Sequence, residues 1–353
     1  MPAQHSTSSI EPTRGMVSST TRELIEAAAY EVWRPQMYHQ AFGGTDAAEI
    51  IAEDGPQPGN NCGYGDTLCC GTFGELLQGQ LPVGCVPRDP HFLVTMPIAL
   101  FARAHFMPVA GTRSVTVYPS HKLKAKRLAE KLVIALGASG GILFLQSELP
   151  EGKGMASSSA DLVATARSIA RCIKRRIRTS LIEKLMAEIE PSDGVMYPGV
   201  VAYQQRECSL LSFLGQMPAL AIVGIDEGGT VETVDYDQRR SETSATHRAE
   251  YQELLHRARI AIPRGDTATI GRIATASARL HQERAPKRHL NSMLKASEAT
   301  DALGVIVAHS GTMIGILLDR MAADFPLKLR SVLAHVSPFD NSPNIYLTMT
   351  GCR

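Results

Sequence analysis

Residues 149–162 have the sequence Leu-Pro-Glu-Gly-Lys-Gly-Met-Ala-Ser-Ser-Ser-Ala-Asp-Leu. They follow a strand-like run at 141–146 and lead into a helix-like run at 158–177. Gly152 and Gly154 permit positive φ angles and let the backbone approach a ligand closely. The first turn of the predicted helix has unpaired N–H groups and the positive end of the helix dipole, which together favour an anion. The stretch therefore predicts a phosphate-binding turn between a strand and a helix.

Three consecutive serines, Ser157–Ser159, stand at the start of that helix. Their hydroxyls could bond phosphate oxygens or ligate Mg²⁺, which prefers oxygen donors. The alternative is that Ser157 or Ser158 is only an N-cap, as serine often is at a helix start. The turn differs from a P-loop, because Lys153 is followed by Gly154 and not by Ser or Thr. It also lacks the third glycine of a dinucleotide fingerprint.

The charge balance bears on the class of partner. The chain has 353 residues and a formal net charge of +1, from 36 Lys and Arg against 35 Asp and Glu. That balance gives no general attraction to nucleic acid or to a membrane surface, and no apolar run approaches the roughly 18 residues of a membrane span. The odd count of 7 cysteines and the polar amino terminus favour a reducing compartment. We expect a cytoplasmic protein with neither nucleic acid nor a membrane as partner.

Three regions differ in composition. We expect residues 1–60 to form a partly flexible N-terminal extension, with one candidate helix at 20–42 that could dock on the rest of the chain or on a partner. Strand-like and helix-like segments then alternate, as in an α/β or α+β fold, and the turn at 226–229 divides them into domains at 61–225 and 226–353. The expected strands are 92–99, 114–118, 141–146, 219–225 and 305–308, and the expected helices are 124–136, 158–177, 249–260, 267–282 and 290–302.

Basic residues gather toward the end of the predicted helix at 158–177. They are Arg167, Arg171, Lys174, Arg175, Arg176 and Arg178. Cations near a helix C-terminus interact favourably with its dipole, so a solvated face explains them. Nucleic-acid binding is the alternative, but no aromatic side chains are interleaved with these charges.

Three segments, in sequence order, resemble the motifs of the GHMP small-molecule kinases, the family of galactokinase, homoserine kinase and mevalonate kinase. Residues 150–160 resemble its phosphate-binding motif Pro-x-x-x-Gly-Leu-Gly-Ser-Ser-x-Ala, with Ala156 in place of the last glycine. Residues 70–79, Cys-Gly-Thr-Phe-Gly-Glu-Leu-Leu-Gln-Gly, resemble the first motif, and residues 307–315 resemble the third. The sequences of these motifs are most similar to those of the L-threonine kinase branch associated with cobalamin synthesis and propanediol use. Cys70 and Phe73 depart from the Pro and Cys expected there.

The resemblance implies a GHMP kinase fold. Its N-terminal domain is similar to the second domain of ribosomal protein S5, and its C-terminal domain is ferredoxin-like, with the active site in the cleft between them. It also implies ATP and Mg²⁺ as cofactors and the conversion of L-threonine to O-phospho-L-threonine. The ATP-binding residues implied are Pro150, Gly152, Lys153, Gly154, Met155, Ala156, Ser157, Ser158 and Ser159.

Roles for the remaining polar residues follow from the same resemblance. Ser158 or Ser157 would hold Mg²⁺ with Glu190 or Glu183, and Asp193 and Lys153 would be catalytic, Asp193 as the base. Asp193 as a simple turn residue is the alternative, because Pro-Ser-Asp-Gly is a good turn sequence. The substrate-binding residues implied are Gly74, Glu75, Gln78, Asp193, His309, Ser310, Gly311 and Thr312. Three of these also have plainer explanations, since Glu75 and Gln78 could cap or pair on a local turn and His309 could be a buried core histidine.

Rival functions stay open at this point. One is a kinase of the same mechanism for another amino alcohol, such as homoserine or serine, because one methyl group is worth only about 1–3 kcal/mol of discrimination. Another is a non-catalytic protein that binds nucleotide as a regulator. Retention of Ser158, Glu190 and Asp193 favours an enzyme whose partners are ATP and a small hydroxy amino acid. A homodimer is a quaternary state that the sequence leaves open.

Overall fold

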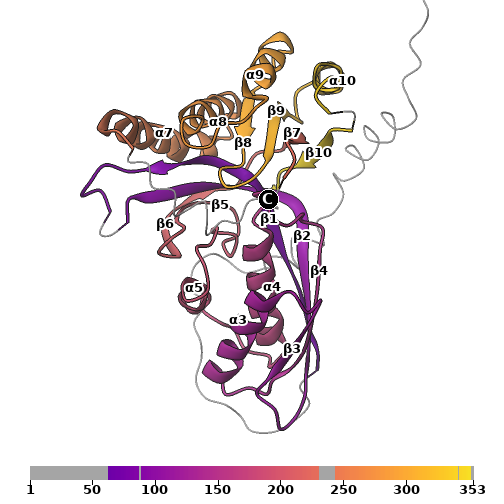
Figure 1. The fold of residues 1–353 in the computed structure, drawn as a ribbon. Helices are drawn as coiled ribbons and strands as arrows, with labels where there is room; N and C mark the ends of the chain where they lie inside the picture. The colour runs from indigo at the N-terminus through magenta and orange to yellow at the C-terminus, as the bar shows by residue number, and fades with distance from the viewer. Residues whose placement is uncertain (1–62, 87–88, 230–242, 341, 351–353) are drawn as a thin grey trace, which may run out of the picture. The chain divides into compact units, whose positions relative to one another are not determined.

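A computed structural model describes residues 63–86, 89–229, 243–340 and 342–350. The N-terminal extension at 1–60, with the helix expected at 20–42, lies outside the described residues. Every described residue belongs to one compact unit. Ten strands of these residues form one sheet. Its main path has the order β10 (Asn344–Leu347), β7 (Leu220–Asp226), β9 (Met313–Asp319), β8 (Gly304–Val307), β1 (Gly65–Gln80), β2 (His91–Pro108), β4 (Gly141–Ser147) and β3 (Val115–Tyr118). The mixed α/β fold expected from the sequence is confirmed (Figure 1).

The first half of the fold is built on a long antiparallel pair, β1 (Gly65–Gln80) and β2 (His91–Pro108). Strand β4 (Gly141–Ser147) pairs antiparallel with β2, and β3 (Val115–Tyr118) pairs parallel with β4. Helices α3 (Leu123–Ala135) and α4 (Ser157–Cys172) pack on each other, and α4 packs on β1 and β2. Most of α4 is buried because small residues such as Ala160, Ala164 and Ala166 let it fit closely between these elements.

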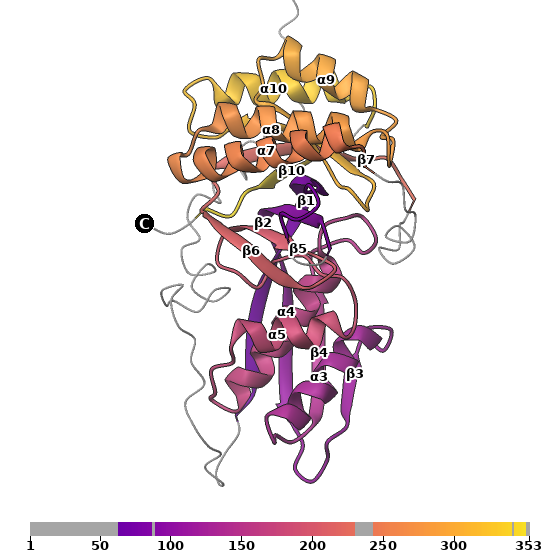
Figure 2. The same cartoon turned by 90° about the vertical axis from the view of Figure 1, so that its left-hand side faces the viewer.

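The second half carries helices over the other end of the sheet (Figure 2). Strands β7 (Leu220–Asp226), β9 (Met313–Asp319) and β8 (Gly304–Val307) are antiparallel neighbours, with β10 (Asn344–Leu347) on the outer side of β7. The helices are α7 (Ala245–Arg264), α8 (Thr267–His281), α9 (Leu290–Ala299) and α10 (Phe325–Val336). A hairpin of β5 (Val200–Gln204) and β6 (Ser209–Gly215) joins β2, and α5 (Thr179–Ala187) precedes it. Strand β8 pairs with β1 at Val307 and Glu75, so the sheet is continuous between the two halves. The division into two domains at 225/226 stays a prediction.

The structure differs from the expected elements at several places, α4 and β1 among them. The helix expected at 158–177 ends at Cys172, and Lys174 takes a positive φ of 54°, so the basic residues from 174 onward follow the helix and do not lie on it. Strand β1 was not expected, because its four glycines disfavour a strand. Three of them lie where other backbone comes close: a Cβ on Gly71, for example, would lie 2.5 Å from the Met155 carbonyl oxygen. Within the described residues, every helix is too short or too polar to cross a membrane.

Candidate functional site

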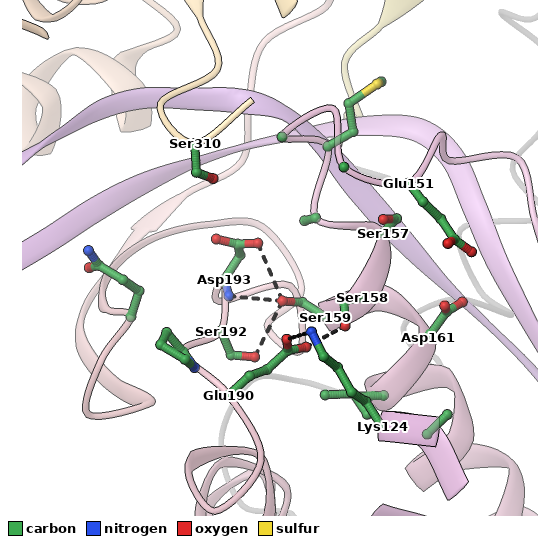
Figure 3. Close-up of a pocket in the computed structure, with 18 of the residues that line it drawn as sticks. Lys124, Glu151, Ser157, Ser158, Ser159, Asp161, Glu190, Ser192, Asp193 and Ser310 are labelled. Carbon is green, nitrogen blue, oxygen red and sulfur yellow. Dashed lines mark hydrogen bonds and ion pairs between the residues drawn. The ribbon is translucent and has the colours of Figure 1, made fainter. Parts of the chain in front are cut away.

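A cavity of about 590 Å³ opens where the start of α4, the loop before α3, the segment after α5 and the loop after β8 come together (Figure 3). Its polar lining residues include Glu75, Gln78, Lys122, Lys124, Glu151, Ser157, Ser158, Ser159, Asp161, Glu190, Ser192, Asp193 and Ser310. The N-terminal ends of two helices, α3 and α4, contribute to this lining. Since unpaired N–H groups and a positive dipole end mark each helix start, these two helix starts favour an anion at their end of the cavity.

The turn before α4 has the positive φ angles that its glycines predict, 71° at Gly152 and 79° at Gly154. Ala156 is the N-cap of α4 and has a left-handed φ of 56°, which costs a non-glycine residue roughly 1–2 kcal/mol. No side chain caps the helix, so the alternative that Ser157 or Ser158 is only an N-cap is wrong. Both serines lie inside the first turn, which leaves backbone N–H groups there for an external acceptor.

The three sequence motifs meet at this turn through their backbones. The N–H groups of Thr72 and Gly74 donate to the carbonyls of Met155 (3.2 Å) and Gly154 (3.1 Å). From the third motif, the N–H of Thr312 donates to the Lys153 carbonyl at 3.2 Å. A Cβ on Gly311 would lie 1.9 Å from that same oxygen, so only glycine allows this approach. The first and third motifs therefore fix the position of the phosphate-binding turn.

Ser158 and Glu190 form the first polar group of the cavity. The Ser158 hydroxyl donates to Glu190 Oε1, and Lys124 Nζ lies 2.5 Å from Glu190 Oε2. The Glu190 side chain is buried, whereas Lys124 is half exposed. A serine hydroxyl beside a buried carboxylate offers two oxygen donors to a cation. Glu183 lies outside this lining, on α5, where its carboxylate accepts a hydrogen bond from Tyr197 Oη at 2.7 Å.

Ser159 and Asp193 form a second polar group. The Ser159 hydroxyl lies 3.3 Å from Asp193 Oδ2 and 3.3 Å from Ser192 Oγ, and it accepts the Asp193 N–H at 3.1 Å. The Asp193 carbonyl also accepts from Val195 N–H at 2.7 Å, so the residue lies in a turn as its sequence indicates. Figure 3 shows its carboxylate pointing toward the side of Ser310, while Glu190 faces Ser158 and Lys124. The turn thus presents the carboxylate to the cavity.

Lys122 and Asp161 were not predicted from the sequence. Lys122 Nζ lies 2.6 Å from both Asp161 Oδ2 and Glu151 Oε1, and Asp161 is almost fully buried. Burial alone would lower the pKa of Lys122, but its hydrogen bonds to the two carboxylates raise it above the ordinary value. Burial raises the pKa of Asp161, against the effect of Lys122. Lys122 is charged and fixed at the cavity wall.

Lys153 is directed away from the cavity. Its ammonium lies 2.6 Å from Asp226 Oδ2, at the end of β7, and donates to the Gly229 carbonyl at 2.5 Å. Burial would raise the pKa of Asp226, but hydrogen bonds from Lys153 and Thr312 lower it below its ordinary value. Lys153 is absent from the lining formed by the described residues, and so are Gly74, His309, Gly311 and Thr312 of the expected substrate-binding set.

Glu75 connects the cavity to a buried histidine. Its Oε2 accepts from the backbone N–H of His309 at 3.1 Å and from His309 Nδ1 at 2.8 Å. Burial raises the pKa of Glu75 to about 7 and lowers the pKa of His309 well below its usual value. His281 Nε2 in turn donates to the His309 carbonyl at 3.1 Å. His309 is thus a buried histidine that anchors Glu75, and neighbouring Ser310 reaches the cavity.

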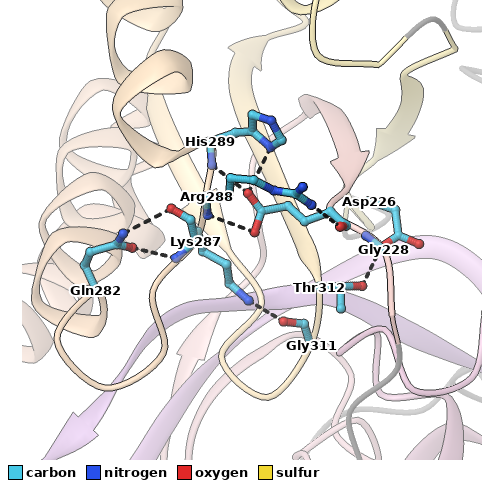
Figure 4. Close-up of polar contacts among 9 residues, drawn as sticks. Asp226, Gly228, Gln282, Lys287, Arg288, His289, Gly311 and Thr312 are labelled. Atoms are coloured by element: carbon cyan, nitrogen blue, oxygen red, sulfur yellow. Dashed lines mark hydrogen bonds and ion pairs between the residues drawn. The ribbon is translucent and has the colours of Figure 1, made fainter.

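The loop from His309 to Thr312 is also held from the side of α8 and α9 (Figure 4). Lys287, which is buried, donates from Nζ to the Gly311 carbonyl, and Thr312 Oγ1 donates to Asp226 at 2.5 Å. Glu227 accepts the backbone N–H of His289 at 2.7 Å and that of Arg288 at 3.2 Å. These contacts fix the third motif above the phosphate-binding turn.

Known proteins are similar to this chain in sequence and in fold. Residues 123–199 match the family described as GHMP kinases N terminal domain. An L-threonine kinase of Citrobacter freundii is 27% identical over 259 residues, which cover 72% of this chain and 87% of that protein. One of Salmonella typhimurium is 28% identical over 268 residues, or 75% of this chain and 86% of that protein.

Two solved structures give the same fold at low sequence identity. The homoserine kinase from Cytophaga hutchinsonii has a TM-score of 0.63 at 13% identity, covering 81% of this chain and 95% of its own. The L. major mevalonate kinase, in complex with R-mevalonate, has a TM-score of 0.58 at 15% identity, covering 82% and 97%. At these identities the likeness concerns the fold alone.

Proposed function

The chain belongs to the GHMP kinase family of ATP-dependent small-molecule kinases, and we propose that it phosphorylates the side-chain hydroxyl of L-threonine. The observation that carries the proposal is that one cavity joins the serine-lined start of α4 to Glu190 and Asp193. The choice of L-threonine rests on the two similar L-threonine kinases, which match most of the chain at 27% and 28% identity.

The triphosphate would bind at the start of α4. The N–H groups of the first turn carry no side-chain cap, and the turn at 152–156 has the left-handed geometry that brings backbone close to a ligand. Ser157 adds a hydroxyl donor. Lys122 and Lys124 line the cavity and supply positive charge, whereas Lys153 would have to leave Asp226 to do so.

Mg²⁺ fits Ser158 and Glu190. Their hydroxyl and carboxylate oxygens are hard donors, and Mg²⁺ in kinase sites takes one or two protein ligands and completes its shell with waters and phosphate oxygens. Bound there, it would neutralise charge on the phosphates. Of the two carboxylates considered from the sequence, Glu190 lines the cavity and Glu183 bonds Tyr197, so we assign the ligand role to Glu190.

The transfer breaks the bond between the γ-phosphorus and its bridging oxygen in ATP and forms a bond from that phosphorus to the threonine hydroxyl oxygen. The hydroxyl proton must be accepted, and we assign this role to Asp193. Its carboxylate lines the cavity and lies 3.3 Å from the Ser159 hydroxyl, which also accepts the Asp193 backbone N–H. Glu75 and Gln78 line the cavity from β1, as does Ser310 from the loop after β8, and we assign them to the amino-acid end of the substrate.

Other amino alcohols are the second candidate, because Phe73, a fully buried residue of β1, replaces the residue expected in the first motif. A substrate panel separates the candidates. With Mg-ATP, ADP release should depend on L-threonine, and mass spectrometry should detect O-phospho-L-threonine; serine and homoserine should react more slowly. Equal ADP release without any amino acid would refute the kinase activity. Faster turnover of homoserine than of L-threonine would refute L-threonine as the preferred acceptor. The cytoplasmic location, the lack of a nucleic-acid or membrane partner and the homodimer stay predictions.

A further inference from the structure

Lys124 lies at the second position of α3, with its ammonium on a buried carboxylate of the cavity (Figure 3). Its side chain is 51% exposed, while that of Glu190 is only 4% exposed. About half of the side chain therefore faces solvent, and its ammonium makes the polar contact that holds it. A flexible lysine whose tip rests on a buried anion is suited to exchange that anion for another.

Both carboxylate oxygens of Glu190 accept a hydrogen bond in this structure. Oε1 accepts the Ser158 hydroxyl, and Oε2 receives Lys124 at 2.5 Å. A buried carboxylate without a counter-charge is strongly unfavourable, so one cation is needed here whether or not ligands are bound. The ammonium thus rests on one of the two groups that fit Mg²⁺ under the proposed function.

The two other lysines near the phosphate-binding turn are fixed in place. Lys122 is 13% exposed and holds two carboxylates, those of Asp161 and Glu151. Lys153 is 18% exposed and holds Asp226 together with the Gly229 carbonyl. Lys124 has one partner and the greatest exposure of the three. It is the lysine that can change partner with least disruption.

The position of Lys124 in its helix would also suit an anionic ligand, although each lysine there pairs with a carboxylate of the protein. The first turn of α3 holds no acidic residue, and Lys122, Lys124 and Lys126 cluster there. Cations are disfavoured at the N-terminal end of a helix, because the dipole is positive at that end. An anion that faces this end would reverse the penalty, and the start of α4 faces the same cavity.

We propose that Lys124 is the counter-cation of Glu190 in the nucleotide-free protein. When a divalent cation binds to Glu190, the Lys124 ammonium leaves this carboxylate and moves to the phosphates of ATP. The inference rests on the proposed function, since it takes Glu190 and Ser158 as the metal donors. It makes Lys124 a competitor of the metal before the nucleotide binds and a ligand of the nucleotide afterwards.

The test compares Lys124→Met with wild type in two binding measurements. Mn²⁺ binding to the nucleotide-free protein, followed by electron paramagnetic resonance, should become tighter by about tenfold, because the competing charged hydrogen bond is lost. Binding of a hydrolysis-resistant ATP analogue in the presence of Mg²⁺, followed by calorimetry, should become weaker by about tenfold. A purely structural lysine would not move the two affinities in opposite directions.

The matched control is Lys126→Met, two residues along the same helix, where a 40% exposed side chain forms a loose pair with Glu130 at 3.9 Å. It should change neither affinity by more than about twofold, as expected for an exposed pair. Lys124→Arg keeps the charge and should hold Mn²⁺ binding close to wild type. Thermal melting of each variant checks that the protein is folded.

Several results would overturn the role of Lys124. Unchanged or weaker Mn²⁺ binding in Lys124→Met would show that Lys124 does not compete for the metal donors. Unchanged binding of the ATP analogue would show that the ammonium does not reach the phosphates. Neither measurement needs turnover. If Lys124→Met shifts the two affinities in opposite directions but the wild-type protein has no activity on L-threonine, L-threonine is refuted as the acceptor while the role of Lys124 is supported.

Discussion

Gly311→Ala should disable the enzyme by displacing the phosphate-binding turn. The added Cβ would lie 1.9 Å from the Lys153 carbonyl oxygen and 2.4 Å from the Gly154 nitrogen, both of which are backbone atoms. Real Cβ contacts are essentially never shorter than 3.0 Å, so the third motif and the turn must separate by roughly 1 Å. A displacement of that size at reacting groups costs about 100-fold in rate. We expect kcat for threonine-dependent ADP release to fall by that factor.

The matched control is Gly63→Ala, because a Cβ on Gly63 meets no atom within 4 Å. It should leave kcat unchanged within about twofold, as is usual for surface substitutions. Overpacking also costs about 1–3 kcal/mol of stability, so chemical denaturation must show that Gly311→Ala is folded under the assay conditions. A folded Gly311→Ala protein with wild-type kcat would refute the role of this close contact.

Two further predictions concern Asp193 and Glu75. Asp193→Asn should lower kcat about 100-fold or more if the carboxylate accepts the hydroxyl proton, whereas a wild-type rate would leave Asp193 as a turn residue only. Burial raises the pKa of Glu75 from its ordinary 4.5 to about 7, so the folded protein holds this proton more tightly than the unfolded chain. The free energy of unfolding should therefore fall as pH rises from about 4.5 to 7, and Glu75→Gln should flatten that part of the profile measured by denaturation; an identical slope in the variant would contradict the assignment.

The sequence predicted the turn at 150–160 because its signal is local. Glycines, serines and a following helix lie within one short stretch, and the structure has the positive φ angles and the helix start there. The same locality explains why the helix was predicted too long: a Lys174 with a φ of 54° stops it, and no residue type marks that position in advance. The sequence could not decide whether Ser157 or Ser158 is the N-cap, because that depends on the backbone geometry of Ala156, which the structure shows to be the N-cap.

Contacts between distant segments could not be predicted in the same way. Lys124 lies 66 residues from Glu190, and Lys122 lies 39 residues from Asp161, so nothing in either sequence neighbourhood indicates the pairing. Strand β1 was missed because its glycines look like turn residues, although they serve close contacts such as that of Gly74 with Ala308. Lys153 was expected at the phosphates because of its place in the motif, but the structure pairs it with Asp226.

A crystal structure with Mg²⁺, a hydrolysis-resistant ATP analogue and L-threonine would test the binding mode directly. We expect the γ-phosphate at the first turn of α4, within hydrogen-bond distance of its N–H groups, and the threonine hydroxyl between that phosphate and the Asp193 carboxylate. A triphosphate bound elsewhere, with the residues at 157–159 contacting only protein, would contradict the proposed site.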